Sequence, residues 1–182
     1  STRQLPGGVI TNRVNSYDAA GRATSASVVV PEIAGLIGSE LAGTYTTTSS
    51  YNADGSVNTT GLPATGPIPA ETLTTAYANL TGLPDTLTGT LGSTTATYVT
   101  DTQYLQWGTV SAMLFGTHAG KASMASWVRD PGSQRLIGMS LHRQVNPGVT
   151  DENTAIGYDP AGNITQVAST LPGGVVDNQC FS

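Results

Sequence analysis

Short stretches of β-forming residues alternate with turn residues along the whole chain. Residues 44–50 are β-prone throughout, and after the turn-like segment 51–55 the pattern resumes in residues 56–60. The same order of strand, turn and strand returns in residues 122–129 and 134–145. Short runs of β-branched and aromatic residues bounded by Gly, Pro, Asn and Asp are typical of β-hairpins. We therefore predict an all-β, antiparallel fold built from hairpins, with about ten to twelve strands.

Three segments depart from this pattern. Residues 31–41 begin with proline and carry apolar residues at helical spacing, but Gly35 and Gly38 each weaken a helix by about 1 kcal/mol. We expect a loop there with at most one helical turn. Residues 146–154 and 116–121 are predicted to be surface loops.

A five-residue motif recurs at the predicted turns. Residues 17–21 read Tyr-Asp-Ala-Ala-Gly, residues 51–55 read Tyr-Asn-Ala-Asp-Gly and residues 158–162 read Tyr-Asp-Pro-Ala-Gly. A weaker copy occupies residues 104–108 and a looser one residues 77–82. Asp or Asn followed three residues later by Gly suits a tight turn, because the short polar side chain bonds nearby amides and Gly accepts a positive φ.

The residues assigned to this structural repeat, including one arginine that follows the first copy, form the candidate site. They are Tyr17, Asp18, Gly21, Arg22, Tyr51, Asn52, Gly55, Tyr104, Gly108, Tyr158, Asp159 and Gly162.

A second duplication brackets the chain. Residues 5–9 and 171–175 both read Leu-Pro-Gly-Gly-Val. The first copy begins 12 residues before Tyr17, and the second begins 12 residues before position 183, just past the last residue. We therefore expect residues 1–182 to be one segment of repeats, cut at both ends from a longer array.

Composition narrows the classes of function. The chain has 7 Lys+Arg against 12 Asp+Glu, a net charge of −5, and a pI near 4.7. So few basic residues argue against a nucleic-acid partner, because binding phosphates needs clustered Lys and Arg. No apolar run is long enough to span a bilayer. Ser and Thr together supply 16 + 28 = 44 residues, and with 38% hydrophobic residues the chain is not of the disordered class.

Candidate catalytic and metal-binding residues are sparse. His118 and His142 lack neighbouring ligands at metal-binding spacing, and no Gly-x-Ser-x-Gly motif is present. Asp151 and Glu152, the one adjacent acidic pair, fall in a predicted solvated loop and are badly placed to flank one bond. Cys180 has no second cysteine to pair with, so we expect a half-buried strand residue. We predict no enzyme activity, no metal and no cofactor.

The aromatic residues admit two interpretations. Trp107, Trp127 and the seven tyrosines are expected to be packing anchors, which is the usual role of aromatics ahead of turns. The same residues would also suit a platform on which sugars stack. Both interpretations stay open at this point.

The repeats resemble those of a known family. Residues 17–22, followed by Thr24, and residues 158–165 are similar to the YD repeats of bacterial RHS-repeat proteins, in the Ala-, Thr- and Gly-rich style of the secreted actinobacterial members. The resemblance implies an extended β-sheet that spirals into a hollow shell, as in RHS toxins, the cocoon subunits of insecticidal toxin complexes, and teneurins. In the toxin members, the shell encloses a variable C-terminal polypeptide.

The chain departs from the family pattern in places. Asn52 and Ser56 stand where the family favours Asp and Arg, and Leu105 follows Tyr104. The shell-closing plug and the self-cleavage segment are not visible. Asp-Pro pairs at residues 130–131 and 159–160 fit hairpin turns better than the core of that cleavage motif.

The resulting hypothesis is a non-catalytic segment of a secreted or cell-surface bacterial RHS shell. Its expected partners are the rest of the same shell and a C-terminal toxin or effector cargo, together with edge-to-edge self-association. One sheet face should carry Tyr, Val, Leu and Ile, and the other Thr, Ser and Asn. The alternative is an extracellular adhesion or carbohydrate-binding β module; a third possibility, an all-β hydrolase, would need clustered carboxylates.

Overall fold

A computed structural model describes residues 1–35, 37, 38, 40–116, 121–143 and 150–181. These residues form strands, turns and bends without a helix, which confirms the all-β prediction. The described residues therefore contain no helix that could cross a bilayer. The fourteen strands are β1 (Thr2–Leu5), β2 (Gly8–Tyr17), β3 (Ala23–Val30), β4 (Gly43–Tyr51), β5 (Val57–Leu62), β6 (Glu71–Tyr77), β7 (Pro84–Leu91), β8 (Thr94–Tyr104), β9 (Val110–Phe115), β10 (Ser123–Arg129), β11 (Leu136–Arg143), β12 (Thr150–Tyr158), β13 (Ile164–Thr170) and β14 (Val176–Cys180).

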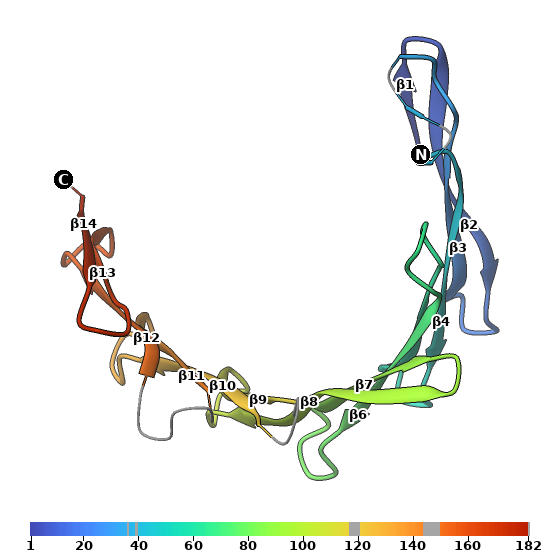
Figure 1. The fold of residues 1–182 in the computed structure, drawn as a ribbon. Helices are drawn as coiled ribbons and strands as arrows, with labels where there is room; N and C mark the ends of the chain where they lie inside the picture. Colours follow the sequence, from blue (N-terminus) through green and yellow to red (C-terminus); the bar gives the residue numbers. More distant parts are fainter. Residues whose placement is uncertain (36, 39, 117–120, 144–149, 182) are drawn as a thin grey trace. The chain divides into compact units, whose positions relative to one another are not determined.

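The order of the strands in the sheet is the order of the strands in the chain, from β1 to β14 (Figure 1). The paired strands from β1 to β6 and from β8 to β14 are antiparallel, as expected of consecutive hairpins. Fourteen strands exceed the ten to twelve expected. The four-residue β1 and five-residue β14 are too short to give a clear strand pattern in the sequence.

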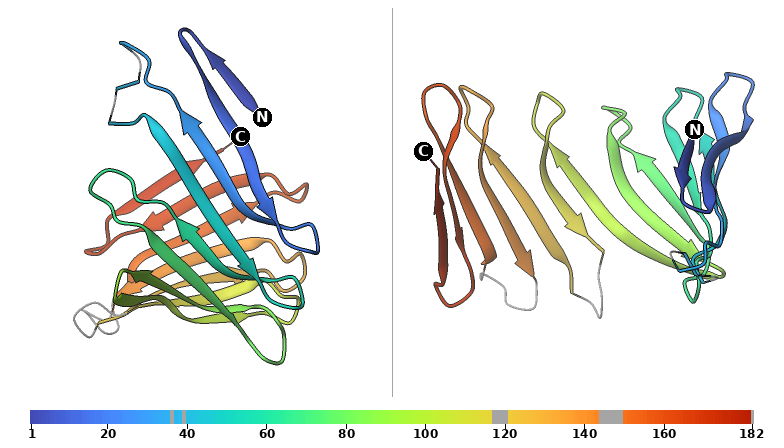
Figure 2. Two further views of the ribbon diagram at one scale, coloured as in Figure 1. Left: turned by 90° about the vertical axis from the view of Figure 1, so that its right-hand side faces the viewer. Right: turned by 90° about the horizontal axis from the view of Figure 1, so that it is seen from above.

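The chain divides into two compact units. The first comprises Ser1–Ala76 and Leu87–Ala96, and the second Tyr77–Thr86 and Thr97–Ser182. In the second unit, β10 to β13 lie side by side (Figure 2). The organisation as one continuous segment of repeats stays a prediction.

A hydrophobic core of the usual kind is missing from the described residues. Only two apolar residues among them are buried, Ile33 (6% exposed) and Ala112 (8% exposed). The other buried residues are Gly89, which has no side chain, and Ser27 (3%) and Thr154 (5%), which carry hydroxyl groups. The sheet must therefore be held mainly by its backbone ladder and by contacts between side chains on neighbouring strands.

Hydroxyl groups pair across neighbouring strands throughout the sheet. Ser27 Oγ lies 2.9 Å from Thr46 Oγ1 and also accepts a hydrogen bond from the Asn15 side-chain amide. The other cross-strand hydroxyl pairs are Ser16–Thr24, Ser50–Thr59, Thr90–Thr95, Ser126–Ser140 and Thr154–Ser169. These pairs explain the high Ser and Thr content, because a hydroxyl group can both donate and accept a hydrogen bond.

The segregation of apolar and hydroxyl residues onto opposite faces is incomplete. On β11, Ile137, Met139 and Leu141 share one face, and Ser140 and His142 share the other. Thr154, however, pairs with Met139 and so lies on the apolar side. Hydroxyl groups therefore occur on both faces.

Two predicted loops can be compared with the structure. Residues 31–41 form a loop among the described positions, as expected: Ile33 and Ile37 exchange backbone hydrogen bonds of 2.9 and 2.7 Å as an isolated bridge, and Gly38 O accepts from the N–H groups of Leu41 and Ala42, each at 3.1 Å, as in a single turn. Ile33 is buried, and its side chain lies against Gly7 and Gly8, where β2 begins. In the loop expected at 146–154, residues 150–154 are part of β12, and residues 146–149 lie outside the described residues. Of the loop expected at 116–121, residues 117–120 also lie outside them.

The duplicated Leu-Pro-Gly-Gly-Val segments fold differently. In the first copy, Leu5 pairs directly with Gly8, so a two-residue turn joins β1 to β2. In the second copy, Leu171 N–H donates to Val175 O at 2.8 Å and Gly174 N–H to Leu171 O at 3.1 Å, which gives a wider turn. The register of the flanking strands thus decides which turn the same five residues adopt.

Replacing Ser27 should destabilise the sheet. The substitution Ser27→Ala removes the partner of both Thr46 and the Asn15 amide, and we expect the free energy of unfolding to fall by about 1–3 kcal/mol. Urea unfolding followed by circular dichroism measures the change. Ser93→Ala, in the exposed turn between β7 and β8, is the matched control and should change stability little. Equal effects of the two substitutions would contradict the role given to the hydroxyl pairs.

Candidate functional site

Each repeat motif forms a closed corner between two strands. At the first corner, residues 18–22, Asp18 N–H donates to Arg22 O at 2.9 Å and Gly21 N–H donates to Asp18 O at 3.0 Å. The Asp18 carboxylate accepts from the backbone N–H groups of Ala20 and Arg22, each at 2.9 Å. Gly21 has a φ of +79°, a conformation that other residues adopt only at a cost. These contacts explain the motif residue by residue.

Arg22 joins this corner to the next one. Its Nε donates to Asp18 Oδ2 at 2.7 Å, and its Nη1 donates to Asn52 O at 3.2 Å. The guanidinium carbon also lies 4.5 Å from the centre of the Tyr51 ring, within the range of a cation–π contact. One side chain therefore touches its own turn, the ring and the backbone of the following corner.

Corner tyrosines donate to the preceding hairpin. Tyr51 Oη donates to Ala23 O at 2.8 Å, Tyr104 Oη to Pro84 O at 2.5 Å and Tyr158 Oη to Leu136 O at 2.8 Å. The acceptors share one property: each is the first residue of the strand that leaves the preceding corner. The tyrosine thus bonds one hairpin laterally to another at a fixed register. This interaction is the candidate functional site of the chain.

The same corner geometry tolerates different side chains. At residues 52–56, Asn52 takes the first position, and the carboxylate of Asp54 accepts from the Ser56 backbone and hydroxyl instead. At residues 159–163, Asp159 accepts from the backbone N–H groups of Gly162 and Asn163 and from the Asn163 amide. The departures from the repeat pattern noted in the sequence therefore preserve the hydrogen bonding of the turn.

Hydrogen bonding within the corners lowers the pKa of their carboxyl groups. The Arg22 backbone N–H and guanidinium hold the pKa of Asp18 below its usual value. The Ser56 hydroxyl and backbone do the same for Asp54, and the Asn163 amide and backbone for Asp159. The Ser133 backbone and hydroxyl lower the pKa of Asp130. Ionised carboxylates are therefore part of the folded corners.

Tyr17 and Tyr104 differ in how exposed they are. Tyr17 closes the first corner but is 60% exposed, and its ring lines an open hollow of about 660 Å³ on β2–β4. Tyr104 is half-buried, and its burial, together with the nearby Asp85 carboxylate, raises the pKa of its hydroxyl. Gly108 completes the Tyr104 corner with a φ of +76°, as the motif requires.

The residues considered for catalysis are placed apart from the corners. On β11, His142 Nε2 lies 3.2 Å from Ser140 Oγ, while its Nδ1 faces the Thr150 hydroxyl at 3.5 Å and not a carboxylate. His118 lies outside the described residues. Among the residues that the structure does describe, no three His, Cys, Asp or Glu side chains gather as a metal site would require.

Two sequence interpretations of single residues are corrected. Asp151 is not in a solvated loop but on β12, with a side chain 13% exposed and an ion pair of 2.5 Å to Arg143. This pairing lowers the pKa of the Asp151 carboxyl group. Cys180 is a strand residue on β14, as expected, but it is exposed, because β14 has a paired strand on one side only.

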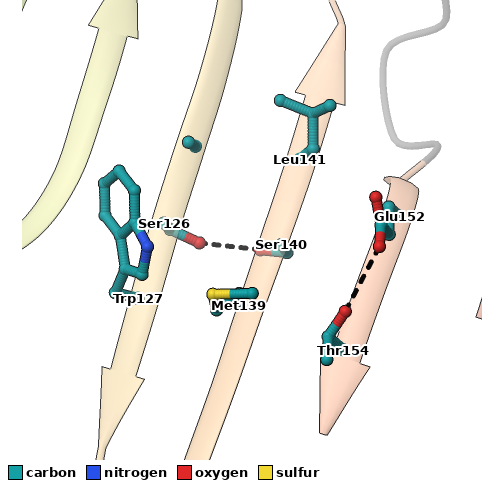
Figure 3. A pocket seen from close by; sticks show the side chains of 8 residues that line it. Ser126, Trp127, Met139, Ser140, Leu141, Glu152 and Thr154 are labelled. Carbon is teal, nitrogen blue, oxygen red and sulfur yellow. Dashed lines mark hydrogen bonds between the residues drawn. The ribbon is translucent and has the colours of Figure 1, made fainter. Parts of the chain in front are cut away.

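A shallow apolar groove of about 180 Å³ crosses β10 to β12 (Figure 3). Trp127, Met139 and Leu141 supply its apolar walls, and Glu152 and Thr154 close it on the β12 side. Trp107 does not line this groove; it lines a separate pocket at the β8–β9 corner, where it is 60% exposed. The two tryptophans therefore line different hollows.

Sequence reasoning missed several contributors to the corners. Arg135, whose guanidinium carbon lies 5.6 Å from the centre of the Tyr158 ring, was not assigned, nor was Asp54. A basic residue four or five positions after the aspartate that opens the turn was the available signal, since Arg22 follows Asp18 and Arg135 follows Asp130 at this spacing. The carbonyl acceptors carry no sequence signal, because every residue has a backbone carbonyl.

Removing one tyrosine hydroxyl should weaken the lateral connection between hairpins. Tyr51→Phe keeps the ring beneath Arg22 but removes the hydrogen bond to Ala23, and we expect a loss of about 1 kcal/mol in the free energy of unfolding. Tyr17→Phe is the matched control, because the Tyr17 ring is mostly exposed. Urea unfolding of both variants measures the difference. A Tyr51→Phe protein as stable as Tyr17→Phe would refute the proposed bond.

Acid should loosen the corners. The folded-state pKa of the corner aspartates is lowered, so their contribution to stability is present above the unfolded value of 3.8 and is lost as the pH falls below it toward the folded value. We expect unfolding free energies measured between pH 6 and about pH 2 to decline below pH 4. Asp18→Asn should be less stable at pH 6 and show a shallower decline. An unchanged slope would contradict the assignment.

Comparison with known proteins bears on the fold. No family model matches the sequence, and no curated protein matches it. Among solved structures, the TcdB2–TccC3–Cdc42 crystal structure matches with a TM-score of 0.71 and 18% identity, covering 97% of this chain and 9% of that chain. The TcdB2–TccC3 crystal structure matches with a TM-score of 0.69, 21% identity and coverages of 91% and 8%. A structure of the Photorhabdus luminescens Tc holotoxin pore matches with a TM-score of 0.67 and 21% identity, covering 91% of this chain and 8% of that chain.

The chain thus spans less than a tenth of the length of the chains it matches. At these identities, the likeness concerns the fold. The chain therefore has the RHS-shell fold of these toxin-complex chains, as the recurring Tyr-Asp motif predicted.

Proposed function

We propose that this chain is a structural, non-catalytic part of the wall of a secreted or cell-surface RHS shell that encloses a C-terminal cargo. The observation that carries the proposal is the repeated tyrosine bond from one hairpin to the preceding one. Together with the backbone ladder, this bond builds a sheet by adding hairpins sideways. Such a sheet grows in one direction, which suits a wall better than a closed globular domain.

Exposed apolar residues on one face of β11 support a wall that something else covers. Ile137, Met139 and Leu141 are each 36–37% exposed in the middle of β11, and Trp127 borders the same groove. In water this apolar face is unfavourable, since each buried square ångström of such a surface gains about 25 cal/mol. A cargo polypeptide would cover it in the full protein, and the small volume of the groove fits side chains better than a folded domain.

The arrangement of polar residues favours a passive role. The hydroxyls of Ser126, Ser140 and Thr154 are held by neighbouring hydroxyls across strands, and His142 has no carboxylate partner on its Nδ1. A serine hydrolase needs a free, activated hydroxyl and an oriented histidine. These side chains instead stabilise the sheet, so we assign no catalytic residue and no cofactor to the chain.

The expected partners follow from charge and from the sheet edges. With a net charge of −5 the chain is unsuited to nucleic acid, and its partners are other parts of the same shell, the cargo, and a second copy of an exposed strand edge. All five residues of β14 are exposed, and Val176 is 58% exposed. A strand that is paired on one side only, as β14 is with β13, can add a further strand through the backbone groups of its other edge.

A charge placed on β14 should reduce self-association. We expect the chain to form dimers or larger species at high concentration, measured by size-exclusion chromatography with light scattering. Val176→Lys places a charge on the edge strand and should weaken association by about tenfold, as edge lysines do in natural sheets.

The matched control is Leu80→Lys, at a fully exposed position in the β6–β7 corner away from the sheet edges. This change removes an exposed apolar residue without touching an edge strand and should leave association unchanged. A clean monomer at high concentration, or equal effects of both lysines, would contradict a wall that grows by its edges.

A further inference from the structure

The corner between β10 and β11 departs from the repeat motif that the described corners at the same kind of position share. Five described corners have tyrosine before the turn and glycine in the left-handed position near its end: 17/21, 51/55, 77/82, 104/108 and 158/162. The corner between β10 and β11 has Arg129 in place of the tyrosine and Gln134, with a φ of +58°, in place of the glycine. Its hydrogen bonds are otherwise those of a corner, with Asp130 N–H donating to Arg135 O at 2.9 Å.

With arginine at this position, the corner lacks the hydrogen bond that a tyrosine hydroxyl would donate to the preceding hairpin. A hollow lies beside the arginine. A tyrosine at this position would donate to Val110 O, the first residue of β9, by analogy with Tyr104 and Tyr158. Instead, a pocket of about 610 Å³ lies between the two corners, lined by residues 104–107 on one side and by Arg129, Pro131 and Gln134 on the other.

Arg129 is incompletely satisfied in this pocket. Its Nη1 donates to Gln134 O at 3.1 Å, but its Nε is buried and has no hydrogen-bond partner among the described residues. The adjacent Asp130 does not compensate for it, because that carboxylate accepts from the Ser133 backbone and hydroxyl at 2.7 and 2.8 Å. By contrast, Arg22 is paired with Asp18 and Arg143 with Asp151. No carboxylate pairs with Arg129 among the described residues, and a guanidinium without such a partner favours a carboxylate ligand.

An exposed aromatic ring stands at the same pocket. Trp107 is 60% exposed at the tip of the β8–β9 corner, although a tryptophan in a purely structural role would be expected to be covered. Gln106 is exposed beside it, and Gln134 donates to Pro131 O at 2.9 Å with its amide nitrogen. The pocket thus combines an apolar ring face, a cation and amide groups.

We propose that this pocket, here termed the Arg129 pocket, binds an acidic saccharide. The C–H face of a uronic acid ring would stack on the Trp107 indole, the carboxylate would accept from Arg129, and the sugar hydroxyls would bond the amides of Gln106 and Gln134. The inference is independent of the shell role, because it requires only the two adjacent corners of the second unit. It places a recognition site on the wall at the point where the lateral tyrosine is replaced.

The test uses a tetrasaccharide of galacturonic acid as the probe. Its neutral counterpart, with the carboxyl groups reduced to alcohols, tests the contribution of charge, and sodium sulfate tests binding of an anion alone. Trp127→Phe provides the background protein, since it leaves Trp107 as its single tryptophan and lies outside the Arg129 pocket. Quenching of Trp107 fluorescence then reports on the site, with isothermal calorimetry on the unsubstituted chain as a second measurement.

The acidic tetrasaccharide should bind about tenfold or more tightly than the neutral one, and added salt should weaken binding. Arg129→Gln should reduce affinity for the acidic probe by about tenfold or more, and, measured by calorimetry, Trp107→Ala should do the same. Arg129→Tyr should fill the pocket, restore the lateral hydrogen bond and abolish binding in a protein at least as stable as the unsubstituted one. Arg3→Gln, on β1, is the charge control and should bind normally.

Several results would overturn the proposal. Equal affinity for the acidic and neutral probes would remove the role of Arg129, and equal binding of sulfate would reduce the pocket to an adventitious anion site. If the acidic tetrasaccharide does not bind at concentrations up to about 10 mM, the pocket is not a saccharide site. Should Arg129→Tyr fail to fold, Arg129→Gln decides alone: an unchanged affinity in that variant refutes the site.

Discussion

Lateral hydrogen bonding between hairpins is the constraint on which this structure depends, because few apolar side chains are fully buried. Among the described apolar side chains only Ile33 and Ala112 are, and many others are half-buried on the sheet, so the hydrophobic term comes from partly covered faces and not from an enclosed core. The backbone ladder, the paired hydroxyls and the corner tyrosines must together hold each strand in register. A pair such as Ser27–Thr46 contributes a larger share of the stability here than in a two-layered protein, because there is less core packing to offset the loss of a buried hydrogen bond.

Within each corner, different side chains close the turn and hold the neighbouring hairpin in register. Aspartate or asparagine closes each turn locally, and the tyrosine reaches outward to a carbonyl of the preceding hairpin. Arg22 and Arg135 add a cation against the tyrosine ring, which keeps the ring over the preceding corner. Where the tyrosine is missing, at Arg129, the same scaffold leaves a pocket with an unsatisfied donor. Structural regularity and a candidate binding site therefore arise from the same motif.

The amino-acid pattern was sufficient for the fold class and for the position of the corners. Tyrosine, a short polar residue and glycine at fixed spacing are local requirements of one turn, so they are visible in the sequence. The acceptor carbonyl groups of Ala23, Pro84 and Leu136 were not visible in the sequence, because every type of residue carries a backbone carbonyl. Residues 150–154 were assigned to a loop because their pairing with β11, and the Asp151–Arg143 ion pair between these two strands, is not a local property of the sequence. The two turns formed by Leu-Pro-Gly-Gly-Val likewise depend on strand register and not on the five residues themselves.

The choice of a main-chain oxygen as the tyrosine's acceptor has an evolutionary consequence. A hairpin can be exchanged, duplicated or allowed to diverge without any compensating change in its neighbour, provided that the neighbour still starts a strand at the same place. Genetic recombination among such units would then preserve the architecture while the surface chemistry drifts. Agreement in three-dimensional form at 18–21% identity is the outcome that such interchangeable parts would produce.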